Sequence, residues 1–301
     1  MSDWLEIVVP VPVAAADEVA ALLADRVDAA SAGTEIRGDE IVFWVAVDAG
    51  EETLALTRDA ARALADGGFA VDPSRVRAQP AMPEAEWRDA WKRYFHVTRI
   101  TRNLVIVPSW ESYERQIGDL ILDLDPGQAF GTGAHATTRM MLEELQSLAD
   151  GGARPARFLD VGAGSGILSI ATALLFPDAS GVAVDNDPIA VDAARENADH
   201  NGVGARLVST ADALGTLAPE RFDLILANIQ ADVLRALRAA ITDLLAAGGT
   251  LVLSGLLATQ VEGVAGDYAE AGGLERVTVR ADRDAPDWCC AVLRAPDREA
   301  R

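Results

Sequence analysis

The first eighty residues carry apolar positions with two different periods. Apolar residues recur at every third or fourth position over residues 14–29 and 51–65, which predicts two amphipathic helices. The turn dipeptide Gly38-Asp39 predicts a hairpin between them. The predicted strands cover residues 4–9, 34–37, 40–47 and 69–77. The order βαββαβ is that of a ferredoxin-like α+β domain, which we assign to residues 1–79. Because no catalytic group of side chains stands out there, we expect it to serve recognition or packing.

Residues 80–100 interrupt this pattern and form a predicted linker. Its helix, over residues 84–95, carries Trp87 and Trp91 one turn apart. A tryptophan pair of this kind is more often a packing stripe than a ligand site, so we expect these residues to pack between domains. Short strands are predicted beyond the linker, at residues 104–107 and 117–124.

From residue 158 onward, apolar runs alternate with helical segments. The predicted strands are 158–161, 181–184, 205–209, 224–227, 250–254, 275–280 and 288–294, with helical segments between the first five. This alternation predicts a doubly wound, mostly parallel sheet. The connection over residues 281–287 is too short for a helical crossover, so the last two strands should pair antiparallel. We therefore expect residues 101–301 to form a Rossmann-like, seven-stranded α/β domain.

Charge and cysteine content exclude several classes of function. The chain has 47 acidic and 26 basic residues, a net charge of −21, so binding to nucleic-acid backbones is not expected, whereas a basic partner would be attracted. A solvated acidic surface explains the balance equally well. The two cysteines, Cys289 and Cys290, are adjacent in a predicted strand, so we expect one to face inward and one outward, with no disulfide framework. Neither they nor the three histidines have metal-ligand spacing.

Two further features favour a soluble cytoplasmic protein. No apolar run approaches the length that a membrane-spanning helix needs. The first residues also lack the basic start of a signal peptide. We therefore expect a cytoplasmic location and no membrane partner.

The segment Asp160-Val-Gly162-Ala-Gly164-Ser-Gly166 is the strongest chemical signal. An apolar strand leads into alternating glycines, and a helix begins near Ile167. Glycines allow a tight turn and close approach of a ligand, and the helix start offers free N–H groups to an anion. A dinucleotide loop would place its third glycine where Ile167 stands, so the spacing favours S-adenosylmethionine. Asp160 can then accept hydrogen bonds from the cofactor's ammonium group; an ordinary strand–turn–helix connection is the alternative.

Two aspartates follow the next strands at the same predicted edge. Asp185 ends the second strand, where a carboxylate can bind both ribose hydroxyls. The following pair, Asp187-Pro188, predicts a helix N-cap and first helical residue. Asp212 follows the third strand, where it can contact adenine or simply stabilise a turn.

Asn228 ends the fourth strand, and its carboxamide can accept a hydrogen bond from a substrate amine. Methyl transfer requires the amine lone pair to align with the sulfonium methyl, so positioning is most of the catalysis. Asn228 as a helix cap is the alternative. Thr138 is predicted to cap a helix over residues 139–148, and its hydroxyl can also face the cofactor. Upstream, three glycines around Phe130 suggest a mobile segment that closes over a ligand.

Several of these segments together resemble the PrmA family. The resemblance is carried by Phe130-Gly-Thr-Gly133 with His135 and Thr137-Thr138, and by residues 160–168, 185–188, 227–229 and 253–255. It implies a class I methyltransferase fold preceded by a small substrate-recognition domain. It also implies transfer of methyl groups from S-adenosylmethionine to lysine side chains and the α-amino group of the eleventh protein of the large ribosomal subunit. The implied cofactor contacts are Thr138, Gly162, Asp185 and Asn228, to which we add Asp160, Gly164, Phe130 and Asp212.

Asn228 is therefore the candidate catalytic residue, and no side chain stands out as a dedicated base. One competing hypothesis is a lysine methyltransferase of another protein, such as an electron-transfer flavoprotein subunit. The complete amino-terminal domain and the linker argue against it. A second is a non-catalytic module that retains cofactor or assembles a complex, which the intact Thr138, Asp185 and Asn228 disfavour. A nicotinamide enzyme is a third, which calorimetry with each cofactor would separate.

Overall fold

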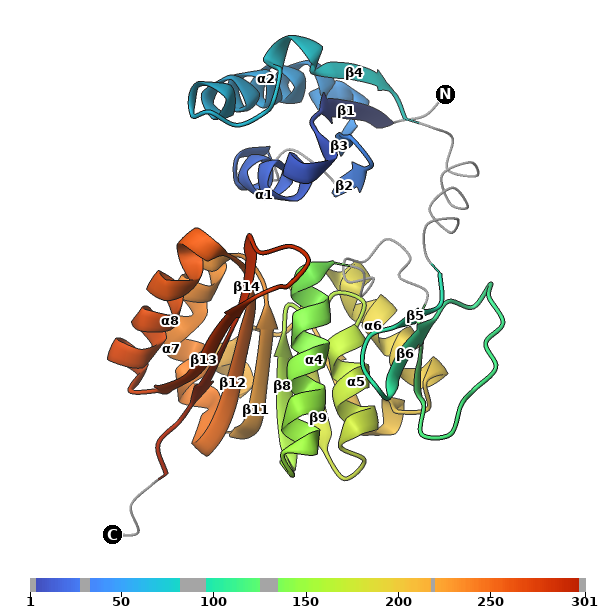
Figure 1. The fold of residues 1–301 in the computed structure, drawn as a ribbon, viewed down its shortest axis with the longest axis vertical. Coiled ribbons are helices and arrows are strands. Elements are labelled where there is room, and N and C mark those ends of the chain that lie inside the picture. The colour runs from blue at the N-terminus through green and yellow to red at the C-terminus, as the bar shows by residue number, and fades with distance from the viewer. Residues whose placement is uncertain (1–3, 28–32, 82–95, 125–134, 218–219, 298–301) are drawn as a thin grey trace. The chain divides into compact units, whose positions relative to one another are not determined.

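The computed structural model describes residues 4–27, 33–81, 96–124, 135–217 and 220–297. The chain divides into two compact units, Met1–Arg93 and Tyr94–Arg301 (Figure 1). The whole of the predicted linker helix, including Trp87 and Trp91, lies outside the described residues, so its packing between domains stays a prediction. The predicted domain boundaries at residues 79 and 100 likewise stay predictions.

The smaller unit is a four-stranded antiparallel sheet with two helices. Its strands lie in the order β2-β3-β1-β4, and all neighbouring pairs are antiparallel, as in a split βαβ fold. Apolar residues of β1 and β3 alternate toward the helices, so that Ile7, Phe43 and Leu23 are fully buried in one core. The elements are β1 (Trp4–Pro10), α1 (Ala16–Val27), β2 (Thr34–Arg37), β3 (Glu40–Ala46), α2 (Gly50–Asp66) and β4 (Arg77–Pro80).

The prediction of a strand over residues 69–77 was wrong. The chain there forms a short 3₁₀ helix, Pro73–Arg75, whose cap Asp72 accepts a hydrogen bond from the N–H of Ser74 at 2.9 Å. Proline at the first position of this turn fixes φ and donates no hydrogen bond. The strand begins only at Arg77 and ends at Pro80. A proline is tolerated there because β4 lies at the edge of the sheet.

The larger unit is a seven-stranded sheet in the order β10-β9-β8-β11-β12-β14-β13. The first five in this order are parallel, and β14 is antiparallel to both of its neighbours. The antiparallel pairing of the last two strands confirms the prediction. The strands are β8 (Arg157–Val161), β9 (Ser180–Val184), β10 (Leu207–Thr210), β11 (Phe222–Asn228), β12 (Leu245–Leu257), β13 (Glu275–Ala281) and β14 (Trp288–Arg294).

Helices cover both faces of this sheet (Figure 1). Helix α4 packs on α5 and α5 on α6, whereas α7 packs on α8. The second pair shares a core with side chains such as Val161, Ala227 and Leu253. The helices are α4 (Ala136–Asp150), α5 (Ile167–Leu175), α6 (Pro188–His200), α7 (Ala231–Leu244) and α8 (Ala258–Gly272). Between β10 and β11, where a helical segment was predicted, the described residues hold only a 3₁₀ helix, Leu214–Leu217.

A separate three-stranded sheet precedes α4. It consists of β5 (Thr98–Arg99), β6 (Leu104–Val107) and β7 (Leu120–Asp123). Asn201, just after α6, fastens β7 to the main unit, because its side chain donates to the carbonyl of Asp123 at 2.6 Å and accepts from its N–H at 2.8 Å.

Both cysteines are buried, which corrects the prediction that one of them faces outward. They lie in β14, which is an inner strand of the sheet between β12 and β13. Helices α4 and α8 both pack against β14. Alternation of side chains therefore sends each cysteine into protein rather than one into solvent.

Candidate active site

The loop between β8 and α5 lies at the carboxyl end of β8, the edge where ligands bind in open α/β sheets. Its three glycines, Gly162, Gly164 and Gly166, have φ values of 73°, 53° and 79°, a left-handed region that other residues rarely adopt. Gly162 has a second requirement, because an added Cβ would overlap Cγ2 of Ile229. Gly162 and Gly164 are partly exposed, whereas the other residues of the turn are buried. The loop therefore presents bare backbone at the sheet edge.

Asp185, at the end of β9, holds this loop in place. Its Oδ2 accepts a hydrogen bond from the N–H of Gly164 at 2.8 Å, and its Oδ1 accepts one from the N–H of Asp187 at 3.1 Å. Each carboxylate oxygen can accept a further hydrogen bond, and the residue is only half-buried. The carboxylate is thus oriented by backbone and still able to accept from hydroxyls. Asp187 caps α6 with Pro188 at the first turn, as predicted.

Asn228 and Thr138 meet at the same edge, from β11 and α4. Asn228 Nδ2 donates to Thr138 Oγ1 at 3.2 Å, with Thr138 buried and Asn228 half-buried. The prediction that Thr138 caps a helix was wrong: α4 starts earlier because its N-cap His135 accepts a hydrogen bond from the N–H of Thr137. The cap alternative for Asn228 is also wrong, since the N-cap of α7 is Gln230.

Comparison with known proteins shows which family this chain belongs to. A family model described as "Ribosomal protein L11 methyltransferase (PrmA)" matches residues 3–296. The chain belongs to the PrmA family. A ribosomal protein L11 methyltransferase of Geobacter sp. (strain M21) is 42% identical over 230 residues, which cover 74% of this chain and 72% of that protein. The corresponding protein of Sorangium cellulosum (strain So ce56) is 36% identical over 310 residues, covering 96% and 95%.

A solved structure agrees with the sequence relatives. The ribosomal protein L11 methylase of Lactobacillus delbrueckii subsp. bulgaricus has a TM-score of 0.59 and 31% sequence identity, and the match covers 67% of this chain and all of that one. The PrmA-family chain is accordingly a methyltransferase with a class I fold, and its cofactor is S-adenosylmethionine.

Asp160 fits such a cofactor. The residue is fully buried in β8, where its Oδ2 accepts from the hydroxyl of Ser169 at 2.7 Å, while Oδ1 has no hydrogen-bond partner among the described residues. Burial raises the pKa of Asp160 to about 6, and the nearby charge of Asp185 acts in the same direction. A buried oxygen without a partner is costly, and a bound ammonium group would supply one. The glycines beside it present backbone without side chains, as a cradle for the methionine moiety requires.

All of the predicted cofactor contacts stay predictions, and for two of them the described residues add no supporting geometry. Asp212 is exposed, and its carboxylate accepts from the hydroxyl of Thr210 at 2.7 Å, which is the turn role considered for it. A contact with adenine stays a prediction. Phe130 lies outside the described residues.

Sequence analysis missed three residues that shape the loop. Ser169 partners Asp160, and Asn197 of α6 donates to the carbonyl of Ser165 at 2.9 Å. Ile229 packs over Gly162. The positions of Ser169 and Asn197 on inward faces of amphipathic helices were the only available signal, and polar residues at such positions do not reveal their partner.

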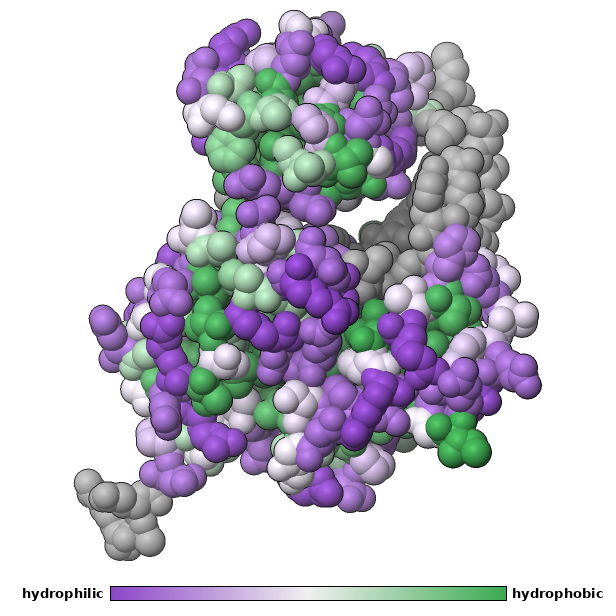
Figure 2. All heavy atoms as spheres, viewed as in Figure 1, coloured by the Kyte–Doolittle hydropathy of each residue, from purple (hydrophilic) through white to green (hydrophobic). Residues whose placement is uncertain are grey.

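The part of the chain that the structure describes holds no group of histidine, cysteine or acidic side chains suited to a metal ion. None of its helices is long and apolar enough to cross a membrane. Hydrophilic residues cover most of the visible face of the larger unit, with hydrophobic ones in small groups between them (Figure 2).

Proposed function

We propose that this methyltransferase transfers methyl groups from S-adenosylmethionine to lysine side chains and the N-terminal α-amine of ribosomal protein L11. The pair of Asn228 and Thr138 carries the proposal, because it places a carboxamide and a hydroxyl beside a loop built for the cofactor. The names of the relatives support L11 as the substrate. The net charge of −21 suits a basic protein substrate.

Each residue of the edge has a proposed part in holding the cofactor. The backbone at Gly162 and Gly164 holds the methionine moiety, and Asp160 accepts a hydrogen bond from its ammonium group. Asp185 accepts hydrogen bonds from the ribose hydroxyls, with its orientation fixed by the N–H of Gly164. Phe130 and Asp212 contact the remainder of the cofactor, Asp212 at the adenine.

Asn228 positions the substrate amine. Because its Nδ2 donates to Thr138, its Oδ1 is turned toward a different partner and can accept a hydrogen bond from the amine N–H. That bond aims the amine lone pair along the line of displacement. The cofactor, when bound, supplies a sulfonium methyl group as the electrophile. No described side chain is placed as a dedicated base, so the amine loses its proton to water before attack.

The amino-terminal unit is proposed to recognise the protein substrate. Its described residues form a ferredoxin-like sheet and helices without a group that binds the cofactor. Separation of recognition from chemistry allows one active site to reach several amines of one target. We place the reaction in the cytoplasm, without nucleic acid or membrane as partner.

Methyl transfer to purified L11 tests the proposal. Isotopically labelled S-adenosylmethionine should add labelled methyl groups to lysines and the α-amine, located by mass spectrometry of peptides. Asn228→Ala should remove most of this transfer. Glu262→Gln, which breaks the exposed ion pair with Arg276 between α8 and β13, is a control that should not. Cofactor binding without any transfer to L11 would contradict the proposed substrate.

Two alternatives are less well supported. A lysine methyltransferase of an electron-transfer flavoprotein subunit is not favoured by the family match, which extends over residues 3–296. A non-catalytic binding module is disfavoured because Asn228 and Thr138 keep the pairing that methyl transfer needs.

A further inference from the structure

The turn between β13 and β14 lies at the active-site edge of the sheet. Trp288, the first residue of β14, pairs with Leu257 at the carboxyl end of β12. The N–H of Ala258 donates to the carbonyl of Asp287 at 2.8 Å, which fixes the turn to the start of α8. The carboxyl ends of parallel strands share one edge, so this turn and Asn228 lie at the same end of the sheet.

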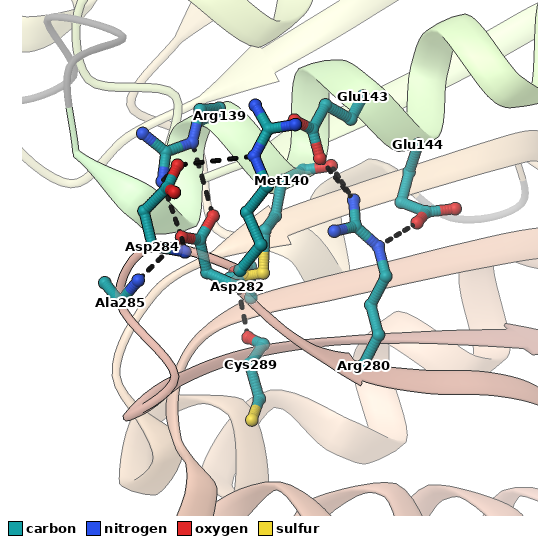
Figure 3. A network of polar contacts seen from close by, with 11 residues as sticks. Arg139, Met140, Glu143, Glu144, Arg280, Asp282, Asp284, Ala285 and Cys289 are labelled. Carbon is teal, nitrogen blue, oxygen red and sulfur yellow. Dashed lines mark hydrogen bonds and ion pairs between the residues drawn. The ribbon is translucent and has the colours of Figure 1, made fainter.

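The turn holds the first turn of α4 through an ion pair between Arg139, which is partly exposed, and the buried Asp282 (Figure 3). The guanidinium of Arg139 lies 2.5 Å from Asp282 Oδ1 and 3.3 Å from Asp282 Oδ2. Asp282 Oδ1 also accepts hydrogen bonds from the N–H groups of Asp284 and Ala285, each at 2.9 Å. Burial opposes ionisation of Asp282, but the hydrogen bonds from Arg139 and from the two N–H groups lower its pKa overall. The carboxylate is therefore charged, and both of its oxygens accept hydrogen bonds.

A second contact holds the other side of the same helical turn. The ring of His135 packs edge-to-face on Trp288, with ring centroids 4.9 Å apart and an interplanar angle of 74°. Thr138 lies three residues after His135 and directly before Arg139, so β14 and the turn before it contact α4 on both sides of Thr138 in the sequence. Farther along α4, Arg280 pairs with Glu143 at 3.0 Å (Figure 3).

We propose that Asp282 and Arg139 are positioning residues for the cofactor site, acting through Thr138. The inference rests on the proposed role of Thr138 in that site. An ion pair with one buried partner contributes little net stability compared with apolar residues of similar volume, so we assign this pair a role in fixing geometry. This ion pair fixes the backbone of the first turn of α4, and with it the direction of the Thr138 hydroxyl. A shift of this turn would separate Thr138 Oγ1 from Asn228 Nδ2.

A double-mutant cycle distinguishes positioning from general stabilisation. The affinity for S-adenosylhomocysteine is measured by calorimetry for the unaltered protein, Asp282→Asn, Thr138→Ala and the double variant. Asp282→Asn keeps an oxygen for the two N–H groups but removes the nearer of the two carboxylates that pair with Arg139, leaving the exposed Asp284 at 3.4 Å. It should weaken binding about fivefold to tenfold in the unaltered protein, and less than about twofold in the Thr138→Ala background.

Two further variants keep the test decisive. Arg139→Gln should reproduce the same coupling and replaces Asp282→Asn if that variant does not fold. Glu262→Gln breaks the exposed ion pair between α8 and β13 and should leave affinity unchanged. Parental affinity in Asp282→Asn, or an equal loss with and without Thr138, would overturn the inference. Failure of the unaltered protein to bind S-adenosylhomocysteine would instead overturn the proposed function on which it rests.

Discussion

The side-chain amide of Asn228 donates to the hydroxyl of Thr138 at 3.2 Å, joining the end of β11 to the first turn of α4. This bond uses the carboxamide nitrogen and leaves Oδ1 to face a substrate amine. It also makes the orientation of that oxygen depend on a helix that is distant in the sequence.

Replacement of Asn228 by alanine should lower kcat far more than it lowers stability. Loss of one fixed hydrogen-bonding group at a reacting centre costs about 10²-fold to 10³-fold in rate. Because Asn228 is only half-buried, the unfolding temperature should change little. Steady-state methylation kinetics together with calorimetric unfolding check this. A variant with near-parental kcat would exclude Asn228 from the chemistry.

Replacement of Gly162 by alanine should be strongly destabilising. The new Cβ meets both an unfavourable φ of 73° and Cγ2 of Ile229, for a combined cost of about 3 kcal/mol. Gly202 has a similar φ of 67° with nothing within 4 Å of an added Cβ, so Gly202→Ala should cost only about 1 kcal/mol.

Urea unfolding of the two glycine variants makes the comparison. Adding Ile229→Ala, which removes Cγ2, should recover part of the loss in Gly162→Ala and none in Gly202→Ala. Equal losses in the two single variants would show that the contact with Ile229 is unimportant.

Asp160 should make the protein less stable as pH rises. Burial raises the pKa of this carboxyl to about 6 in the folded protein, above its ordinary value of about 3.9 in the unfolded chain. Between these values the folded protein binds more protons, so the free energy of unfolding falls as pH rises through the window. The loss is nearly complete about one pH unit above the folded pKa and amounts to about 3 kcal/mol at most.

The neutral variant Asp160→Asn lacks this pH-dependent loss. Its stability relative to the unaltered protein should therefore increase by about 1 kcal/mol between pH 5 and pH 7.5. Its affinity for S-adenosylhomocysteine should fall, because the carboxylate that accepts the ammonium group is gone. Urea unfolding at the two pH values and calorimetry measure these opposite effects. A stability difference independent of pH would contradict the burial argument.

Cys289 and Cys290 should resist alkylation in the folded protein. Both are buried, and burial is the main cause that raises the pKa of each thiol, so the reactive thiolate is scarce. Treatment with iodoacetamide at pH 8 should modify neither residue until urea unfolds the chain, as followed by mass spectrometry. Rapid modification of the native protein would contradict the placement of β14.

The doubly wound class of the larger sheet could be predicted from the sequence because buried parallel strands are apolar runs bounded by turns. Residues 288–294 were assigned without error, and the short return before them required an antiparallel pair. The strand over residues 69–77 was misplaced because its apolar residues pack beneath a proline turn instead of pairing. A local apolar pattern does not distinguish these outcomes.

The site was only partly predictable. Glycines and aspartates at strand ends signal a ligand edge by spacing alone. Three features depend on elements that meet only in the folded chain. They are the contact of Asn228 with Thr138, the ion pair of Arg139 with Asp282, and the burial of Asp160. No local pattern reports the start of α4 at Ala136, because it depends on a histidine cap.

The most direct measurement of the central claim is methyl transfer to purified ribosomal protein L11 with labelled S-adenosylmethionine, read by mass spectrometry. The account predicts labelled methyl groups on lysine and N-terminal amines with the unaltered protein and almost none with Asn228→Ala. An unaltered protein that binds the cofactor but leaves L11 unlabelled would contradict it.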